Sequence, residues 1–230
     1  MKIIILTIVI LIIFFIYSEE KVIIKAPYID QTKRWPTGCE SVSTVMALQY
    51  LGIKISVDEF IKYLDKSEIV SKKGQLFASD PKESFIGSPY SQYSFGCFAP
   101  VIVKALKKIL PKYEGNKVKY EIKDLTGVSM QTLKSNYLDK KIPVIFWATM
   151  NMAPKREGRT WIIKETGKKF TWPAGEHCLL LVGYDNDKYY FNDPWQNHGL
   201  IGYEKTLVET RHKELYSMAL AVYKKKHTLV

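Results

Sequence analysis

Three polar segments, far apart in the chain, contain the residue types of a nucleophilic cysteine site. Cys39 follows a Pro-Thr-Gly sequence, His177 lies in Glu-His-Cys, and Asp193 lies in Asn-Asp-Pro. A thiol attacks a carbonyl carbon when an imidazole takes its proton and a carboxylate or amide orients that imidazole. Cys39 and His177 are about 140 positions apart, within the roughly 130–150 positions typical of one large class of cysteine enzymes. The three segments therefore indicate nucleophilic catalysis by a cysteine thiol.

Cys39 is predicted to begin a buried helix. Apolar residues recur at helical spacing as far as Leu51, small residues occupy the other positions, and the next residue is a glycine suited to end the helix. A helix N-terminus and an imidazolium both lower the pKa of a thiol, and a backbone N–H there can stabilise an oxyanion. Gln31, eight residues upstream, is the candidate second oxyanion donor. Glu40 is expected to cap the helix or to be solvated.

His177 and Asp193 are predicted to lie on neighbouring antiparallel strands. An apolar strand beginning at Cys178 and an Asp-Asn-Asp turn signal at 185–187 indicate a hairpin. A turn centred on the first two of those turn residues would place His177 opposite Asp193, with their Cβ atoms roughly 4.5–5.5 Å apart. The Asp193 carboxylate could then accept a hydrogen bond from one imidazole nitrogen. A register error of one residue would favour Asn192 instead, although its side chain should point to the opposite face.

The remaining patterns place helices first and an antiparallel sheet afterwards, which indicates an α+β domain. Helices are expected at 56–64, from Pro100 to the residue before Pro111, and at 129–140; strands are expected at 144–149, 178–184, 189–191 and 217–223, with a hairpin inside 151–176. Residues 67–98 are expected to be mostly irregular and to form a surface loop over a cleft. Its aromatic part, 87–96, is a candidate for contact with substrate.

The N-terminus is an apolar run from Ile3 to Tyr17 behind Lys2. It is short for a spanning helix, which needs about 17–25 residues, and it suits the apolar region of an export signal. No small-residue cleavage pattern follows it, which argues against simple removal. The segment is therefore expected to be an export signal that can stay as a membrane anchor, with the domain outside the cell. A buried strand or core helix is the alternative. We therefore assign 1–20 to a signal peptide or anchor and 21–230 to one domain.

The formal net charge of +11 is high, but the basic residues are scattered along the chain. No combined aromatic and basic pattern of a nucleic-acid-binding module occurs, so a solvated basic surface is expected and nucleic acid is not an expected partner. A hydrophobic content of 47% is ordinary for a globular protein.

Three cysteines are too few for a disulfide framework. A bond between Cys97 and Cys178 is one alternative; a small buried side chain at Cys178 is the other. His198, His212 and His227 have no metal-ligand spacing and are expected at the surface. No metal and no cofactor are therefore expected.

Seven segments spread along the chain resemble the motifs of one protein family. In chain order they are Pro27-Tyr28-Ile29-Asp30-Gln31, Pro36-Thr37-Gly38-Cys39-Glu40-Ser41, Phe85-Ile86-Gly87-Ser88-Pro89, Pro143-Val144-Ile145-Phe146-Trp147, Glu176-His177-Cys178, Val182-Gly183-Tyr184-Asp185 and Asn192-Asp193-Pro194. Together they resemble the stand-alone, exported relatives of bacteriocin-processing double-glycine peptidases, which are papain-like cysteine proteases of bacteria. The resemblance implies a papain-like fold with Cys39 as nucleophile and His177 as general base and acid. It also implies that Asp193 orients His177 and that Gln31 lies in the oxyanion hole.

No P-loop or exporter sequence follows, so cleavage after a double-glycine leader is not implied. The expected activity is hydrolysis of a peptide or other amide bond outside the cell, with a peptide or protein as substrate. Two alternatives are acyl transfer through the same thioester and a catalytically silent module that binds wall or peptide ligands.

Overall fold

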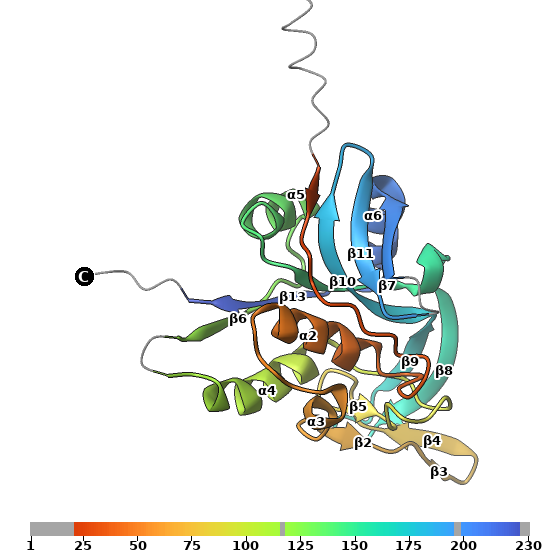
Figure 1. Cartoon of the computed structure of the whole chain (residues 1–230). Helices are drawn as coiled ribbons and strands as arrows, with labels where there is room; N and C mark the ends of the chain where they lie inside the picture. The colour runs from red at the N-terminus through yellow and green to blue at the C-terminus, as the bar shows by residue number, and fades with distance from the viewer. Residues whose placement is uncertain (1–20, 116–117, 196–198, 226–230) are drawn as a thin grey trace, which may run out of the picture.

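The computed structural model describes residues 21–115, 118–195 and 199–225. Within these residues an antiparallel sheet of seven strands has the order β12-β11-β10-β7-β13-β6, with β1 paired to β10 (Figure 1). Its strands are β1 (Val22–Ile23), β6 (Tyr120–Asp124), β7 (Val144–Thr149), β10 (Glu176–Tyr184), β11 (Lys188–Asp193), β12 (Gly199–Glu204) and β13 (Ala219–Lys224). The α+β prediction is confirmed.

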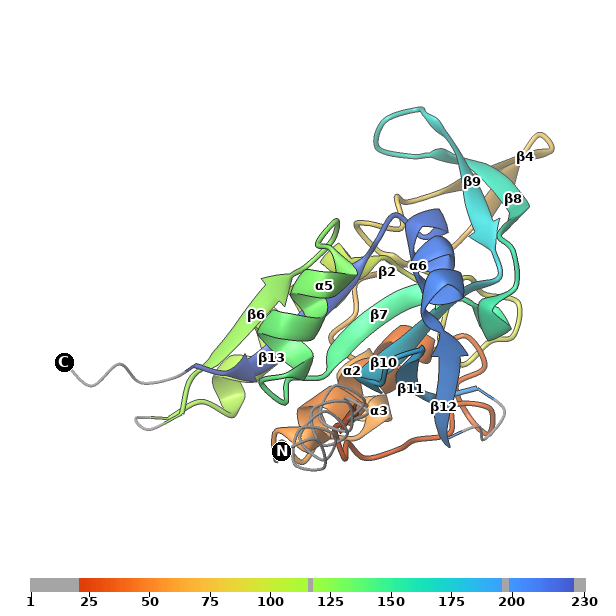
Figure 2. The ribbon, with the colours of Figure 1, turned by 90° about the horizontal axis from the view of Figure 1, so that it is seen from above.

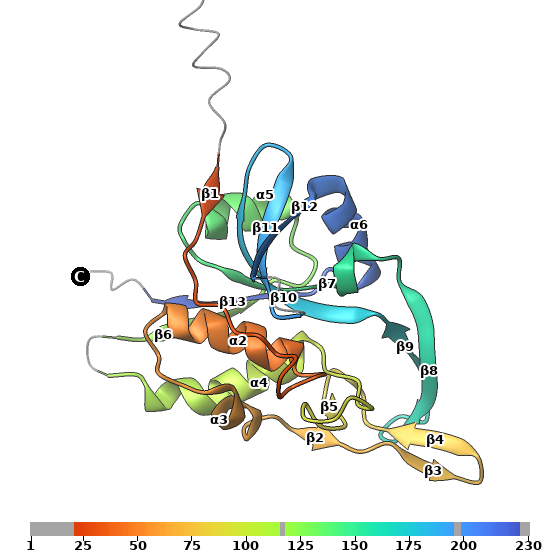
Figure 3. The same cartoon turned by 45° about the vertical axis from the view of Figure 1, so that its right-hand side comes forward.

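Helices cover both faces of this sheet. They are α2 (Cys39–Tyr50), α3 (Val57–Ile61), α4 (Ala99–Ile109), α5 (Met130–Leu133), which continues as a π-helical turn at Lys134–Leu138, and α6 (Lys205–Glu214); short 3-10 turns occur at Leu110–Lys112 and Met150–Met152. In β7, Trp147 Nε1 donates to the Cys97 carbonyl just before α4, whereas the Phe146 ring stacks on His212 of α6. Because neighbouring strand residues point to opposite faces, α4 and α6 lie on opposite sides of the sheet (Figure 3).

The helix α2 is the central helix of the fold, and it lies against β10 and β7. Every residue from Cys39 to Leu48 is buried, which the apolar and small residues of this segment allow. Gly52 follows with φ of 86°, a conformation that glycine adopts without strain, and the helix ends there. The prediction of a buried helix that begins at Cys39 is confirmed.

A second, four-stranded sheet lies at the end of the molecule away from β6 and β13 (Figure 2). It contains β3 (Val70–Lys72), β4 (Gln75–Ala78), β8 (Arg156–Ile163) and β9 (Lys169–Ala174), while β2 (Lys66–Ser67) and β5 (Phe85–Ile86) form a separate parallel pair. The hairpin predicted inside 151–176 is confirmed as β8 and β9. Residues 67–98 are mostly irregular, as predicted, although β3, β4, β5 and the end of β2 lie within that range.

The register of the β10–β11 hairpin differs from the prediction. The Asp185 carboxylate accepts the N–H groups of Asp187 and Lys188, which centres the turn one residue later than expected. A bulge near Gly183 then shifts the pairing, and Leu180 lies opposite Asn192. His177 is consequently not directly opposite Asp193; the two residues are diagonal neighbours across the strands.

The three cysteines Cys39, Cys97 and Cys178 are buried free thiols, so the Cys97–Cys178 disulfide is not formed. Cys178 lies in the fully buried strand β10, as expected for a small apolar side chain. Among the described residues, no helix is both long and apolar enough to cross a membrane. The predicted signal or anchor, 1–20, lies outside the described residues.

Candidate active site

Cys39 is the first residue of α2, directly after a tight turn. The turn is closed by a hydrogen bond of 2.9 Å from the Gly38 N–H to the Trp35 carbonyl. A Cβ at position 38 would lie 2.8 Å from Trp35 Cβ, so this turn requires glycine. Gly38 is also the N-cap and has no side chain that could bond the first N–H groups of the helix. The Cys39 N–H is one of the groups that a helix leaves without an internal partner.

His177 and Asp193 form a fully buried pair, with 2.8 Å between His177 Nε2 and Asp193 Oδ1. Asp193 also accepts the Trp195 N–H at 2.9 Å and the Tyr203 hydroxyl at 3.4 Å. These donors hold the carboxylate in place, and the carboxylate in turn keeps the Nε2 proton on the imidazole. His177 Nδ1 has no hydrogen-bond partner among the described residues and is the nitrogen left to accept a proton.

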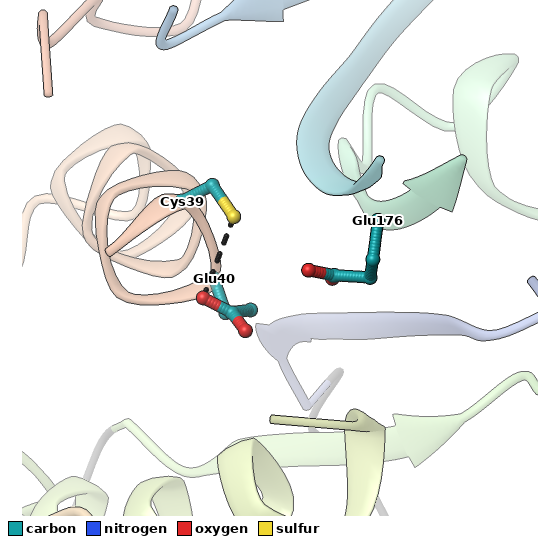
Figure 4. Close-up of side chains that lie close together, drawn as sticks. All are labelled: Cys39, Glu40 and Glu176. Carbon is teal, nitrogen blue, oxygen red and sulfur yellow. Dashed lines mark hydrogen bonds between the residues drawn. The ribbon is translucent and has the colours of Figure 1, made fainter. Parts of the chain in front are cut away.

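Helix α2 is attached to β10 beside His177. Ser43 Oγ donates to the Cys178 carbonyl at 3.1 Å. Burial raises the pKa of the Cys39 thiol, and the nearby Cys178 backbone offsets only a small part of that rise. The thiol therefore lies next to the segment that contains His177. In this structure Cys39 Sγ donates to Glu40 Oε2 at 3.4 Å and does not bond His177 (Figure 4).

Two buried carboxyl groups lie beside the thiol. Glu40 is completely buried, and its Oε1 accepts the Cys97 N–H at 2.5 Å. Glu176, at the start of β10, is 9% exposed, and its Oε1 is buried without a partner among the described residues. The side chains of Cys39, Glu40 and Glu176 converge, with one ligand-type atom from each within 4.8 Å of the others (Figure 4). The prediction that Glu40 is solvated or caps the helix is wrong, because its carboxyl group bonds the segment before α4.

This environment changes the expected ionisation of the nucleophile. Burial raises the pKa of the Cys39 thiol well above its ordinary value of 9.0, and Glu40 and Glu176 add to the rise. Burial also raises the pKa of Glu40 to about 7 and that of Glu176 well above 4.5. The sequence-based expectation of a lowered thiol pKa is therefore reversed, and the resting group is a neutral thiol.

Gln31 connects two parts of the site, the segment after Asp193 and the turn before Cys39. Its backbone N–H donates to the Pro194 carbonyl at 2.9 Å, next to Asp193. Its side-chain Nε2 donates to the carbonyls of Trp35 and Pro36, at 3.3 and 3.2 Å, in the turn before Cys39. Gln31 is thus buried close to the nucleophile as expected, but its amide hydrogens are bonded to the backbone. Its role as an oxyanion donor remains a prediction.

Asn192, the alternative to Asp193, faces away from His177. Its Nδ2 donates to the carbonyls of Ala26 and Pro27 in the N-terminal lead-in segment. The preference for Asp193 as the partner of His177 therefore agrees with the geometry.

The aromatic loop 87–96 borders the site. Thr37 Oγ1 donates to the carbonyls of Ser88 and Ser91, which attaches this loop to the turn before Cys39. At the other end of the loop, a Cβ on Gly96 would lie 2.4 Å from Glu40 Oε1 and 3.3 Å from Glu176 Oε2.

The histidines outside the pair were expected at the surface. His212 is instead buried, with Nδ1 2.8 Å from the Trp147 carbonyl, and this prediction is wrong. His198 and His227 lie outside the described residues. Sequence reasoning also missed the convergence of Glu176 with Glu40; its only sequence signal is the position of Glu176 directly before His177.

Comparisons with known proteins indicate one family. The model of the Peptidase_C39-like family matches residues 23–220. YvpB, an uncharacterised protein of Bacillus subtilis strain 168, is 27% identical over 192 residues, which cover 81% of this chain and 69% of YvpB. A crystal structure from Bacillus anthracis, described as that of a C39-like peptidase, matches with a TM-score of 0.77 and 26% identity over 90% of this chain and 100% of that one.

Proposed function

The chain belongs to the Peptidase_C39-like family, and we propose that it hydrolyses a peptide bond through Cys39, His177 and Asp193. The observation that carries this proposal is the buried His177–Asp193 pair. It leaves His177 Nδ1 without a partner beside the N-terminus of the helix that begins with Cys39. Family membership supports a cysteine peptidase of papain-like type, and the three residues supply a nucleophile, a base and an orienting carboxylate.

The reaction begins from a neutral thiol. Rotation about the Cα–Cβ bond of Cys39 breaks its hydrogen bond to Glu40 and brings the thiol to His177 Nδ1. The imidazole accepts the thiol proton as sulfur attacks the substrate carbonyl carbon, and Asp193 stabilises the imidazolium. The imidazolium then protonates the leaving amine. Water attacks the thioester with His177 again as base, which releases the acid and restores the thiol.

The oxyanion of each tetrahedral intermediate needs hydrogen-bond donors. The Cys39 N–H at the start of α2 is one candidate, because this helix position has no internal acceptor. Gln31 Nε2 is the second candidate, and it must exchange a hydrogen bond to Trp35 or Pro36 for one to substrate. Such an exchange is open to an amide that has two N–H groups.

The loop 87–96 is the proposed contact surface for the peptide. It is attached to the turn before Cys39, and its Tyr93 side chain is 84% exposed. We place the reaction outside the cell because of the apolar run from Ile3 to Tyr17, which suits an export signal or anchor. Fractionation of the native host tests this location: recovery only with soluble cytoplasmic proteins would contradict it.

The test of the activity uses the full chain and a mixed peptide library, with products identified by mass spectrometry. We expect cleavage by the native protein, loss of cleavage in Cys39→Ala, and retention in Cys97→Ala, a matched variant at another buried thiol. Products that carry an added amine would show acyl transfer instead of hydrolysis. Equal cleavage by Cys39→Ala, or peptide binding without any turnover, would overturn the proposal.

A further inference from the structure

A second function of the site is suggested by the three groups that converge on one point. Cys39 and Glu40 come from the first turn of α2, and Glu176 comes from the start of β10 (Figure 4). Their sulfur and carboxylate oxygens are within 4.8 Å of one another, and all three side chains are at least nine-tenths buried. Small side-chain rotations would bring them to the separations found around a bound metal ion.

An independent observation indicates a positive ligand. Glu176 points toward Glu40 and Cys39, and its buried Oε1 has no partner among the described residues (Figure 4). Neither Glu40 nor Glu176 forms an ion pair with a described lysine, arginine or histidine. Two buried carboxyl groups without a counter-charge are costly when ionised, and a cation between them removes that cost.

We propose that Cys39, Glu40 and Glu176 bind Zn²⁺, and that the bound ion keeps the nucleophile inactive. Zinc accepts thiolate sulfur at about 2.3 Å and carboxylate oxygen at about 2.0–2.2 Å, which fits this mixed set of donors. Calcium and magnesium favour sets made only of oxygen and are disfavoured by the sulfur. Glu40 can keep its Oε1 bond to the Cys97 N–H while Oε2, which now accepts the thiol hydrogen, turns to the metal.

On binding, Zn²⁺ replaces the protons of its ligands. The Cys39 S–H bond breaks, a sulfur–zinc bond forms, and the proton leaves to water; any proton on the two carboxyl groups leaves in the same way. Three protein ligands leave a fourth zinc position for water or for His177 Nδ1. While its sulfur is coordinated, the metal withdraws electron density from the thiolate, and Cys39 is a poorer nucleophile toward a carbonyl carbon. Removal of the ion by a chelator restores the thiol.

The experiment measures metal binding directly and does not depend on hydrolysis. The full chain is freed of metal with a chelator, dialysed, and titrated with Zn²⁺ in competition with a chromophoric chelator. We expect one ion per chain in the native protein and affinity at least about 100-fold weaker in Cys39→Ser and in Glu176→Gln. Glu40→Gln keeps an acceptor for the Cys97 N–H and tests the second carboxylate. Cys178→Ala is the matched control, because this buried thiol has Ser43 rather than a proposed ligand as its side-chain partner, and it should bind as the native protein does.

A second measurement identifies the sulfur ligand. Cobalt(II) replaces Zn²⁺, and the thiolate-to-cobalt charge-transfer absorption should appear in the native protein and in Cys178→Ala but not in Cys39→Ser. Circular dichroism of each variant confirms that it is folded. Absence of binding at micromolar Zn²⁺, or binding equally tight in Cys39→Ser and Glu176→Gln, would overturn the proposal. Because this readout needs no substrate, its failure is distinct from failure of the peptidase function.

Discussion

At the scale of single residues, the proposed chemistry depends on which nitrogen of His177 is hydrogen-bonded to Asp193. Asp193 bonds His177 Nε2, and the Trp195 N–H and Tyr203 hydroxyl fix that carboxylate. Burial and the nearby Asp193 raise the pKa of Tyr203, so its hydroxyl stays protonated and continues to donate. The base is thereby held as the tautomer whose Nδ1 can take a proton.

Replacement of the orienting carboxylate should therefore reduce turnover more than substrate binding. For Asp193→Ala we expect kcat to fall by about 10²–10⁴-fold with a small change in KM, because the imidazolium loses its partner. Asn192→Ala is the neighbouring control; it removes hydrogen bonds to Ala26 and Pro27 but leaves His177 oriented. Steady-state kinetics on a cleaved peptide would decide the matter, and equal losses in both variants would argue against Asp193 as orienter.

The raised pKa of the Cys39 thiol gives a second residue-scale prediction. In the presence of a chelator, the rate of alkylation of Cys39 by iodoacetamide should keep rising above pH 9, because only the thiolate reacts and its formation is suppressed by burial. Glu176→Gln removes one of the negative charges that contribute to the rise, so its profile should move to lower pH. Mass spectrometry of the labelled peptide gives the rate at this one thiol. A native profile centred well below pH 8 would contradict the expectation.

At the scale of elements, the turn before α2 orients Cys39, the proposed nucleophile. Gly38→Ala would place a Cβ 2.8 Å from Trp35 Cβ, and one of the two backbone segments must move. We expect a loss of about 1–3 kcal/mol in the free energy of unfolding together with lower activity. Gly115→Ala is the matched control, because a Cβ there meets no atom within 4 Å. Denaturant unfolding and peptide cleavage, measured on both variants, should separate them clearly; similar behaviour would exclude a special role for this turn.

Some helices and strands could be predicted from the sequence, and others could not. The strand 144–149 and the helix from Cys39 were predicted because apolar pattern, turn residues and length agreed there. The helix α6 was missed because its buried contacts come from few residues, chiefly Val208 and His212, which leave little apolar periodicity. The edge strand β12 was missed for a similar reason, since it has only intermediate and exposed residues.

One contact of the candidate site could be predicted from the sequence, and another could not. The contact between His177 and Asp193 was predicted from a hairpin, and it is present although the register was wrong, because diagonal neighbours are still within reach of one another. The carboxyl pair Glu40 and Glu176 could not be predicted. These two residues come together only through the packing of α2 on β10, and no local pattern reports that packing.

At the scale of the whole molecule, His212 makes stability depend on pH. Burial lowers its pKa to about 4 from 6.5, since α6 encloses the imidazole against Phe146 and the Trp147 carbonyl. The unfolded chain takes up a proton near pH 6.5 and the folded chain only near pH 4, so this contribution is complete above pH 6.5 and is lost as the pH falls toward 4. The loss is about 3 kcal/mol.

The free energy of unfolding should depend on pH more strongly in the native protein than in His212→Phe. Between pH 7 and pH 4, the native protein should lose about 3 kcal/mol more unfolding free energy than His212→Phe, in which the stacked ring has no titrating nitrogen. Urea unfolding at several pH values provides the measurement. Parallel pH curves for the two proteins would mean that His212 does not govern acid stability.

The position of Gly96 has a consequence for how this protein can diverge. The space where its side chain would be is taken by the carboxyl oxygens of Glu40 and Glu176, residues that lie 56 and 80 positions away in the chain. Amino-acid substitution at position 96 therefore depends on which residues occupy positions 40 and 176. In an alignment of homologues, a side chain at 96 should occur together with shorter residues at 40 and 176, so that the three distant columns vary together.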